Sequence, residues 1–518
     1  MKLDMSKAYD RVSWLFLLRM MRALGFNAKW CDLVYCTISS YYYLVLWDGS
    51  AYGRFKSNRG VRQGDPLSPS LFLICMESFS RLLQHHTSAG TIQSYFTKVG
   101  ALQISHLLYA DDILLFTNGS KRSIERLMSM VNSFCNWTGQ ALNNSKSSIF
   151  LPQDISTARR RTLLQTTGFT EGRFPTTYLG APLFPGRVKI EYFQRLEDQS
   201  RARITGWMRN MLSLGGKITL VESVLNSMAA HVLACLSTPT AVIDRISSLL
   251  SNFIWDSGGQ SRHHWVSWSD ICREKQAGGL GIRHLDAIRT GFQYKLAWQS
   301  MDPNSLWGRF VHSRYKEGQQ GSHIWTYVSK ALAGFRMQCS WNIGKGELTV
   351  ADFCWIYQAT PPQDLMHLPM HVVMNDPPSL TKLTLVLPLR GRQDLQATNI
   401  SNLPDNLSWH RSAFGHFSTQ AFRAVCNTPR PRDKILSSVW QAWIPPKISA
   451  FVWRLKHRAV PTDDQIRSCG IYLASSCRCC QMPREEIAAH LFILGDEATK
   501  IWERGKTLLD LPIPRTFT

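Results

Sequence analysis

Three aspartates carry the chemistry that this sequence suggests first. Asp111 and Asp112 are adjacent, and they interrupt an apolar stretch that runs from Ile104 to Phe116. Two charges in such a stretch are costly unless a cation or a basic partner neutralises them. The flanking residues predict two strands joined by an acidic turn, so both carboxylates would be exposed at one end of a hairpin. Asp4, at the end of a short predicted N-terminal strand, supplies a third carboxylate.

Three carboxylates in this arrangement predict a divalent-cation site. Mg²⁺ prefers oxygen ligands and is often shared between protein carboxylates and substrate phosphates. In nucleotidyl transfer, two such ions activate an attacking 3′-hydroxyl and stabilise the leaving pyrophosphate. The alternatives are a solvated turn for Asp111 and Asp112 and a surface acid for Asp4.

The composition indicates a polyanionic partner. The chain has 518 residues, of which 44% are hydrophobic, so it has room for roughly three domains with real cores. Its 59 Lys and Arg outnumber 37 Asp and Glu, which gives a net charge of +22. Nucleic acid is the usual partner of so basic a protein, and a basic surface without a specific partner is the alternative.

The cysteines and the absence of targeting signals indicate an intracellular protein. Four of the 13 cysteines lie singly in apolar segments and are expected to be buried thiols of a reducing compartment: Cys31, Cys75, Cys135 and Cys235. The charged N-terminus does not resemble a signal peptide, and no apolar run approaches the roughly 20 residues that span a bilayer. We therefore expect neither secretion nor membrane insertion.

Periodicity predicts the elements around these residues. Leu15, Leu18 and Leu24 predict one helix face, and Asn27 is a candidate N-cap for the next helix. A strand over 41–46 precedes an Asp-Gly turn, residues 60–69 form a loop, and helices follow at 71–82 and 122–138. Helices over 187–250 carry five basic residues: Arg195, Arg201, Arg203, Arg209 and Lys217. Beyond residue 253 tryptophan becomes frequent, and the prolines at 361–362 and 377–378 predict a loop-rich linker.

Five segments in order resemble the palm motifs of LINE-type (non-LTR) retrotransposon reverse transcriptases. They are Leu3–Asp10, Gly60–Pro69, Tyr109–Asp112, Leu142–Ser147 and Tyr178–Gly180. Beyond them, 207–239 resembles the thumb helices of plant elements, 268–285 their connecting region, and the end of the chain their reverse-transcriptase zinc-binding domain. A group II intron maturase is a less favoured interpretation, because the sequence of residues 62–69 and the cysteine-containing C-terminal segment are more similar to LINE elements.

The resemblance implies an α+β fold with a right-hand-type polymerase palm, in which helices accompany an antiparallel sheet. It implies a palm over 1–185, a helical thumb over 186–252, a Trp-rich connector over 253–400 and a small zinc-binding-like domain over 401–518. It also implies that the chain is N-terminally truncated just before the first catalytic aspartate, without fingers, and that its compartment is the nucleus.

The family roles transfer to matching positions. Asp4, Asp111 and Asp112 would hold Mg²⁺ or Mn²⁺, and Lys146 would protonate or neutralise the pyrophosphate. The expected substrate-binding residues are Tyr9, which would exclude a 2′-hydroxyl, together with Arg62, Gln63, Gly64 and Tyr109. The alternatives are a core tyrosine for Tyr9, a surface arginine for Arg62 and a solvated lysine for Lys146.

A cysteine cluster near the end predicts a structural zinc site. Cys477 and Cys480 form a Cys-x₂-Cys pair, and His490 follows. The resemblance adds a fourth cysteine at a position that is Gly495 here, so a substitute would have to come from Cys479, Cys469 or Asp496. The alternative is a decayed site with free thiols.

The function implied by the resemblance is RNA-directed DNA polymerisation by two-metal nucleotidyl transfer. The expected partners are an RNA template, a DNA primer or target, and deoxynucleoside triphosphates. The alternative is a non-catalytic remnant of a retroelement that binds nucleic acid through its basic thumb and its C-terminal module.

Overall fold

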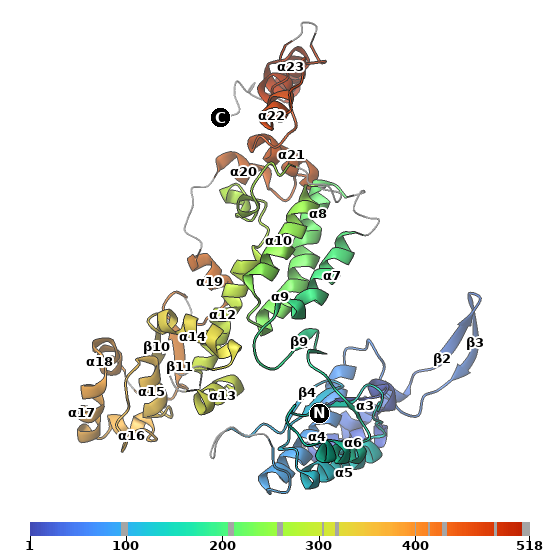
Figure 1. Ribbon diagram of the computed structural model, residues 1–518, viewed down its shortest axis with the longest axis vertical. Coiled ribbons are helices and arrows are strands. Elements are labelled where there is room, and N and C mark those ends of the chain that lie inside the picture. Colours follow the sequence, from blue (N-terminus) through green and yellow to red (C-terminus); the bar gives the residue numbers. More distant parts are fainter. Residues whose placement is uncertain are drawn as a thin grey trace. The chain divides into compact units, whose positions relative to one another are not determined.

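The computed structural model describes the chain apart from residues 95–101, 206–211, 256–262, 303–304, 316–320, 399, 413–414, 427–432, 481–483 and 510–518 (Figure 1). The chain divides into two compact units. The first comprises Met1–Pro185 with Leu306–Gln319, and the second comprises Gly186–Ser305 with Gln320–Thr518. The first unit combines helices with a sheet, as the predicted α+β class requires.

A five-stranded sheet organises the first unit. Its order is β4-β5-β1-β6-β7, so β1 is the central strand. All neighbouring strands are antiparallel except β6 and β7. The strands of this sheet are β1 (Lys2–Asp4), β4 (His106–Tyr109), β5 (Asp112–Leu115), β6 (Ser148–Ile149) and β7 (Thr170–Glu171).

Helices cover this sheet and enclose its core. They are α1 (Ala8–Arg11), α2 (Trp14–Ala23), α3 (Ala28–Ser39), α4 (Ser68–Ser88), α5 (Lys121–Thr138) and α6 (Thr157–Thr167), and α13 (Leu306–Arg314) is assigned to the same unit. Phe79 of α4 and Phe134 of α5 pack with ring centroids 4.7 Å apart, and both are buried. The core of the unit spans Leu3 to Phe169.

The predicted face of α2 was wrong in part. Leu15 is 60% exposed, whereas Leu17 and Met21, four residues apart on one side of the helix, are buried. The predicted N-cap of α3 is confirmed, because the Asn27 side chain accepts a hydrogen bond from the Trp30 N–H (2.8 Å).

Two hairpins complete the first unit. The predicted strand and Asp-Gly turn are confirmed as β2 (Tyr43–Trp47) and β3 (Ser50–Phe55), which extend away from the helices of this unit (Figure 1). The second hairpin pairs β8 (Thr176–Tyr178) with β9 (Ala181–Leu183).

A helical bundle forms the start of the second unit. It comprises η1 (Ile190–Phe193), α7 (Gln194–Ile204), α8 (Leu214–Leu220), η3 (Val221–Leu225), α9 (Asn226–Cys235), α10 (Thr240–Ile254), α11 (Trp268–Ile271), η4 (Lys275–Ala277) and α12 (Leu285–Met301). Its core includes three residues from much later in the chain, Leu436, Trp453 and Ala459. The segment that contains the predicted C-terminal domain therefore contributes to the core of the bundle.

Two predictions about the bundle are corrected. Lys217 is only 5% exposed, with its amine 5.5 Å from the centre of the Phe253 ring, so it is a core residue and not part of a basic surface. Cys235 is exposed, because the apolar face of α9 passes through Val232 and Leu233 instead. Arg209 lies outside the described residues.

The apolar segment Leu214–Cys235 is longer than the sequence analysis anticipated. Its 22 helical residues have a mean hydropathy of 1.4 over the most apolar window, which meets the length and composition of a membrane span. Ile218, Val221 and Leu225 within it are buried in the core of the bundle.

The region predicted as a loop-rich linker contains helices. They are α14 (His323–Arg336), α15 (Val350–Ile356), α16 (Met370–Met374), α17 (Pro377–Val386) and α18 (Leu389–Gln396), beside the strand pair β10 (Cys339–Asn342) and β11 (Asn406–Trp409). Pro377 does not break structure here, because it occupies the first turn of α17, where a missing N–H costs nothing. Asp376 caps this helix through the Ser379 N–H (3.1 Å).

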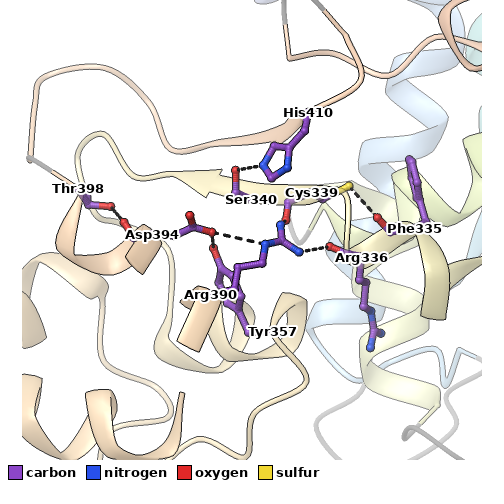
Figure 2. Close-up of polar contacts among 9 residues, drawn as sticks. All are labelled: Phe335, Arg336, Cys339, Ser340, Tyr357, Arg390, Asp394, Thr398 and His410. Carbon is purple, nitrogen blue, oxygen red and sulfur yellow. Dashed lines mark hydrogen bonds and ion pairs between the residues drawn. The ribbon is translucent and has the colours of Figure 1, made fainter. Parts of the chain in front are cut away.

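Arg390 ties these helices to the strand pair (Figure 2). Its guanidinium donates to the carbonyl oxygens of Arg336 and Cys339 and lies 4.0 Å from an Asp394 oxygen. Tyr357 donates to the same Asp394 carboxylate (2.8 Å). These contacts join α14, α15 and α18 around the start of β10.

The remaining elements follow Trp409. They are α19 (Thr419–Cys426), α20 (Lys434–Val439), α21 (Pro446–Lys456), α22 (Asp463–Ser468), η5 (His490–Leu494) and α23 (Asp496–Leu509). Trp453 of α21 donates to the Gly278 carbonyl oxygen (2.9 Å), and His457 lies 2.7 Å from the same oxygen. These contacts attach α21 to the loop before α12.

Candidate active site

Strands β1 and β5 place Asp4 opposite Asp112. In their antiparallel register Asp4 pairs with Asp112, and the preceding pair is Leu3 with Ile113. Leu3 and Ile113 are both fully buried. The two carboxylate-bearing residues are therefore fixed at the end of a strand pair whose neighbouring side chains anchor it in the core.

The third carboxylate lies in the turn between β4 and β5. Tyr109 pairs with Asp112, so Ala110 and Asp111 are the two turn residues. Ala110 has a φ of 51°, a left-handed conformation that glycine usually supplies in such turns and that costs other residues about 1 kcal/mol or more. Strained backbone of this kind occurs preferentially at functional sites. The turn leaves Asp111 exposed beside Asp112.

The electrostatics of this group favour a bound cation. Burial raises the pKa of Asp112, the positive charge of Lys2 lowers it, and the carboxylates of Asp111 and Asp4 raise it. The net shift is upward, so the ionised form of Asp112 is disfavoured by its surroundings. A divalent ion would supply the missing positive charge, and carboxylate oxygens are the ligands that Mg²⁺ and Mn²⁺ prefer.

A cavity of about 330 Å³ opens beside the carboxylates. Five of the nine residues predicted for catalysis and substrate binding line it, namely Asp4, Tyr9, Gln63, Asp111 and Lys146. They come from four of the five motif segments, which the fold has brought together.

The other predicted residues lie around this cavity without lining it. Asp112 is the cross-strand partner of Asp4. Tyr109 is 65% exposed on the hairpin. Arg62 stacks its guanidinium 5.4 Å from the centre of the Tyr41 ring, and Gly64 is exposed in the same loop as Arg62.

Tyr9 combines a packing contact with a place at the cavity. Its ring stacks on Phe72 of α4, with centroids 4.9 Å apart and an interplanar angle of 13°. Phe72 is buried, whereas Tyr9 is only partly buried. The Tyr9 ring is thus held rigidly at the wall of the cavity.

The loop that carries Gln63 is tied to the first motif. The Val61 N–H donates to the Tyr9 carbonyl oxygen (2.8 Å). Gly60 has a φ of 88°, and a Cβ at this position would lie 2.7 Å from the Asp10 carbonyl oxygen. Only glycine fits such a close approach without a backbone shift. This attachment brings Gln63 to the cavity.

Three further residues, which were not predicted, support the site. The Asp4 N–H donates to Ser147 Oγ (3.2 Å), and the Asp4 carbonyl oxygen accepts from the Asn143 N–H (2.9 Å). Asn143 also lines the cavity. Both lie in the segment in which only Lys146 was singled out, so their motif was the available signal. Lys2, which donates to the Thr177 carbonyl oxygen (2.9 Å), has no such signal in the sequence.

The predicted zinc ligands come together at the other end of the chain. The ligand atoms of Cys477, Cys480 and His490 all lie within 4.8 Å of one another. The two sulfurs are 4.0 Å apart, and Cys480 Sγ lies 3.1 Å from His490 Nε2. Two thiolates on a tetrahedral zinc ion, with Zn–S bonds of about 2.3 Å, are about 3.8 Å apart, so this geometry fits zinc.

The proposed substitutes for a fourth ligand do not join this group. Cys479 is exposed, and the Cys469 thiol faces the Gln465 carbonyl oxygen (3.3 Å). Asp496 approaches through its backbone, whose N–H lies 3.4 Å from Cys480 Sγ. Among the residues that the structure describes near the cluster, the group consists of two cysteines and one histidine.

Comparison with known proteins now identifies the first unit. The sequence profile of the reverse transcriptase (RNA-dependent DNA polymerase) family matches residues 1–183. Residues 1–183 are a reverse transcriptase domain by this match. The profile described as zinc-binding in reverse transcriptase matches residues 417–502, which include all three members of the metal-binding group.

Individual relatives agree with this assignment. The chain is 32% identical over 144 residues to a Pol polyprotein from a type-2 retrotransposable element of Drosophila melanogaster, covering 28% of this chain and 13% of the relative. It is 25% identical over 334 residues to a putative ribonuclease H protein of Arabidopsis thaliana (58% of this chain, 54% of the relative). A transposon-encoded 149 kDa protein of Xenopus laevis is 24% identical over 323 residues (61% and 24%). The chain thus spans about half or less of these relatives.

The raised pKa of Asp112 predicts that the ionised Asp112 carboxylate lowers the stability of the reverse transcriptase domain at neutral pH. A carboxyl with a raised pKa binds its proton more tightly in the folded state, so its contribution to stability falls as pH rises from the ordinary carboxyl range through the folded pKa. Without metal at neutral pH, Asp112→Asn should therefore raise the unfolding temperature. Thermal unfolding in chelator at neutral pH and at pH 4 measures this, and the gain should shrink at the lower pH. A variant less stable than wild type at neutral pH would contradict it.

Gly495 offers a direct test of the zinc-binding module. Its φ of −74° suits any residue, and a Cβ there would lie 3.2 Å from Cys480 Sγ but 2.8 Å from the His490 carbonyl oxygen. Gly495→Cys should supply a fourth ligand and raise zinc affinity by about tenfold or more, after a small backbone adjustment.

Competition with a chromophoric chelator measures that affinity. Gly495→Ser is the matched control, because it introduces the same Cβ with a poor zinc ligand. Equal affinities for the cysteine and serine variants would show that the new thiol does not reach the metal.

Proposed function

We propose that this chain catalyses RNA-directed DNA synthesis, adding deoxynucleotides to the 3′-hydroxyl of a primer with release of pyrophosphate. The observation that carries the proposal is the cross-strand pairing of Asp4 with Asp112, beside Asp111 and a polar cavity, in a domain of the reverse transcriptase family. In this proposal residues 1–185 are the palm.

Asp4, Asp111 and Asp112 would hold two Mg²⁺ or Mn²⁺ ions. When bound, such ions activate the attacking hydroxyl and neutralise charge on the leaving group. The side chains act around them. Lys146 is exposed at the cavity wall, where its ammonium neutralises or protonates the departing pyrophosphate.

The cavity residues would select the nucleotide. Tyr9, braced by Phe72, presents a rigid ring that excludes a 2′-hydroxyl. Gln63 at the cavity and the adjacent Gly64 would face the nucleotide and template, while Arg62 and Tyr109, both exposed nearby, would contact template or primer. Tyr178, whose pKa is raised by burial and by the Asp112 carboxylate, stands where the primer end would meet the carboxylates.

The helices of 186–252 would serve as the thumb. Arg195, Arg201 and Arg203 of α7 are exposed, so their guanidinium groups can meet duplex phosphates in a salt-dependent, sequence-independent contact. Lys217 has no part in this surface. The Trp-rich segment from 253 to 400 would connect the thumb to the zinc-binding module.

A second candidate function is nucleic-acid binding without catalysis. The exposed arginines of α7 and the net charge of +22 favour it, because neither depends on the carboxylates.

Primer extension on poly(rA)/oligo(dT), first with Mg²⁺ and then with Mn²⁺, tests the proposal. The control is the double variant Asp111→Asn, Asp112→Asn. Extension by wild type that is lost in the double variant supports polymerisation. Duplex binding that falls with salt, with no extension by either protein, would overturn polymerisation in favour of binding alone.

A further inference from the structure

The β2–β3 hairpin exposes every residue of both strands. It extends from the first unit as a two-stranded ribbon (Figure 1). A two-stranded hairpin is marginally stable in water, and its unpaired edges and apolar surface are normally covered. The exposed side chains are large: Trp47 is 73% exposed, Tyr52 59% and Phe55 54%. A surface of this kind marks an interaction site.

The strand register gathers aromatic rings on one face of the hairpin. Tyr43 pairs with Phe55, Val45 with Tyr52 and Trp47 with Ser50. Tyr43, Val45 and Trp47 alternate along β2 and share a face with their cross-strand partners. Tyr43, Trp47, Tyr52 and Phe55 therefore lie on the same side, across a register shift in the pairing between Tyr43 and Val45. The Tyr43 and Phe55 rings already stack, with centroids 5.6 Å apart. The face is a row of flat apolar rings open to solvent.

Basic side chains lie on the opposite face of the ribbon from these rings, because Arg54 and Lys56 are the immediate neighbours of Phe55. Arg54 and Lys56 lie over the Tyr42 ring, at 3.7 and 4.7 Å from its centre. From residue 41 to 62 the sequence holds four basic residues, Arg54, Lys56, Arg59 and Arg62, and one acid, Asp48. The hairpin thus combines flat rings with positive charge, which suits an anion that carries flat groups.

The root of the hairpin is joined to the cavity loop. Tyr41, two residues before β2, hydrogen-bonds Asp65 through its hydroxyl (3.1 Å) and receives the Arg62 guanidinium over its ring. Gln63, in the same loop, lines the cavity. The loop that contributes Gln63 to the cavity is therefore attached to the root of the hairpin.

We propose that the β2–β3 hairpin is an arm that binds the unpaired RNA template before it enters the cavity. Bases stack on Tyr43, Trp47 and Tyr52, and the phosphates, which follow the edge of the ribbon, pair with the long side chains of Arg54 and Lys56 from the other face. A second copy of this chain is disfavoured as occupant, because two chains of net charge +22 repel each other. That the bound strand is a template rests on the proposed function, whereas the binding itself does not.

Equilibrium binding of the full chain to labelled oligoadenylate tests the arm, with the RNA either alone or annealed to oligo(dT). Trp47→Ala and Tyr52→Ala should each weaken binding of the single strand about tenfold and leave duplex binding within about twofold. Trp47→Phe, which keeps a flat ring, should restore most of the affinity. Replacing Arg54 and Lys56 with glutamine should lower the slope of log affinity against log salt by about 0.7 for each lost contact.

Leu46→Ala is the matched control, because Leu46 is 76% exposed in the same hairpin but points to the other face. Its binding should equal that of wild type. Equal losses in Leu46→Ala and Trp47→Ala, or no loss in either, would overturn the arm. A change of oligomeric state in Trp47→Ala with unchanged RNA binding would assign the face to protein contact and also overturn it.

The outcome is separable from that of the polymerase proposal. In the Asp111→Asn, Asp112→Asn background, Trp47→Ala should still weaken binding of single-stranded oligoadenylate about tenfold. Hairpin-dependent binding without extension supports the arm and rejects polymerisation, and extension with hairpin-independent binding does the reverse.

Discussion

Asp4→Asn should reduce primer extension roughly a thousandfold or more without unfolding the reverse transcriptase domain. The substitution keeps the size of the side chain and removes its charge. Two hydrogen bonds that do not involve the carboxylate hold the backbone of Asp4. Its N–H donates to the Ser147 hydroxyl, and its carbonyl oxygen accepts from the Asn143 N–H. The loss would therefore come from the missing charge at the paired position opposite Asp112.

Single-turnover extension with saturating primer–template measures this loss at the chemical step. Asp10→Asn is the matched control, since Asp10 is an exposed aspartate in the same motif that does not line the cavity. The control should extend primers as wild type does. Activity of Asp4→Asn within tenfold of wild type would remove Asp4 from the proposed ligand set.

Trp453→Ala should lower the free energy of unfolding of the second unit by about 3–5 kcal/mol. Trp453 is fully buried and packs against Trp255, with ring centroids 6.4 Å apart. Its indole N–H also donates to the Gly278 carbonyl oxygen. The alanine leaves a large cavity at a point where a late segment of the chain completes the core of the bundle.

Denaturant unfolding followed by tryptophan fluorescence gives the free energy. Trp443→Ala, in which an 80% exposed tryptophan is removed, should cost less than about 0.5 kcal/mol. Trp453→Phe should cost less than the alanine variant, because it keeps most of the packing and loses mainly the hydrogen bond. Equal costs for Trp453→Ala and Trp443→Ala would show that α21 is not part of the stabilising core.

Local chemistry allowed much of the site to be predicted. The carboxylate-bearing hairpin around Asp111 and Asp112 follows from two apolar runs and a turn, and the cap at Asn27 follows from its hydrogen-bonding side chain. Five of the predicted residues line one cavity. They could be predicted because the order and spacing of the motifs resemble those of a family whose fold brings these motifs together.

Other features depend on contacts between distant residues. The pairing of Asp4 with Asp112 and the hydrogen bond to Ser147 join segments more than 100 residues apart, and hydrophobic periodicity carries no information about such contacts. The composition suggested that Lys217 was part of a basic surface, but its side chain is buried in the core, with its ammonium over the Phe253 ring. Pro377 suggested a loop, although proline is also common in the first turn of a helix. Only the N-cap at Asp376 distinguishes a helix start from a loop here.

The contact between Trp453 and Gly278 also sets an order of events during synthesis. The two residues are 175 positions apart, so the bundle lacks part of its core until α21 has left the ribosome. At about 5–20 residues per second this wait lasts roughly 10–35 s. The core of the first unit ends at Phe169, so the reverse transcriptase domain can fold while the ribosome is still translating the bundle. During the wait, exposed apolar helices such as Leu214–Cys235 make the nascent bundle a natural client for chaperones.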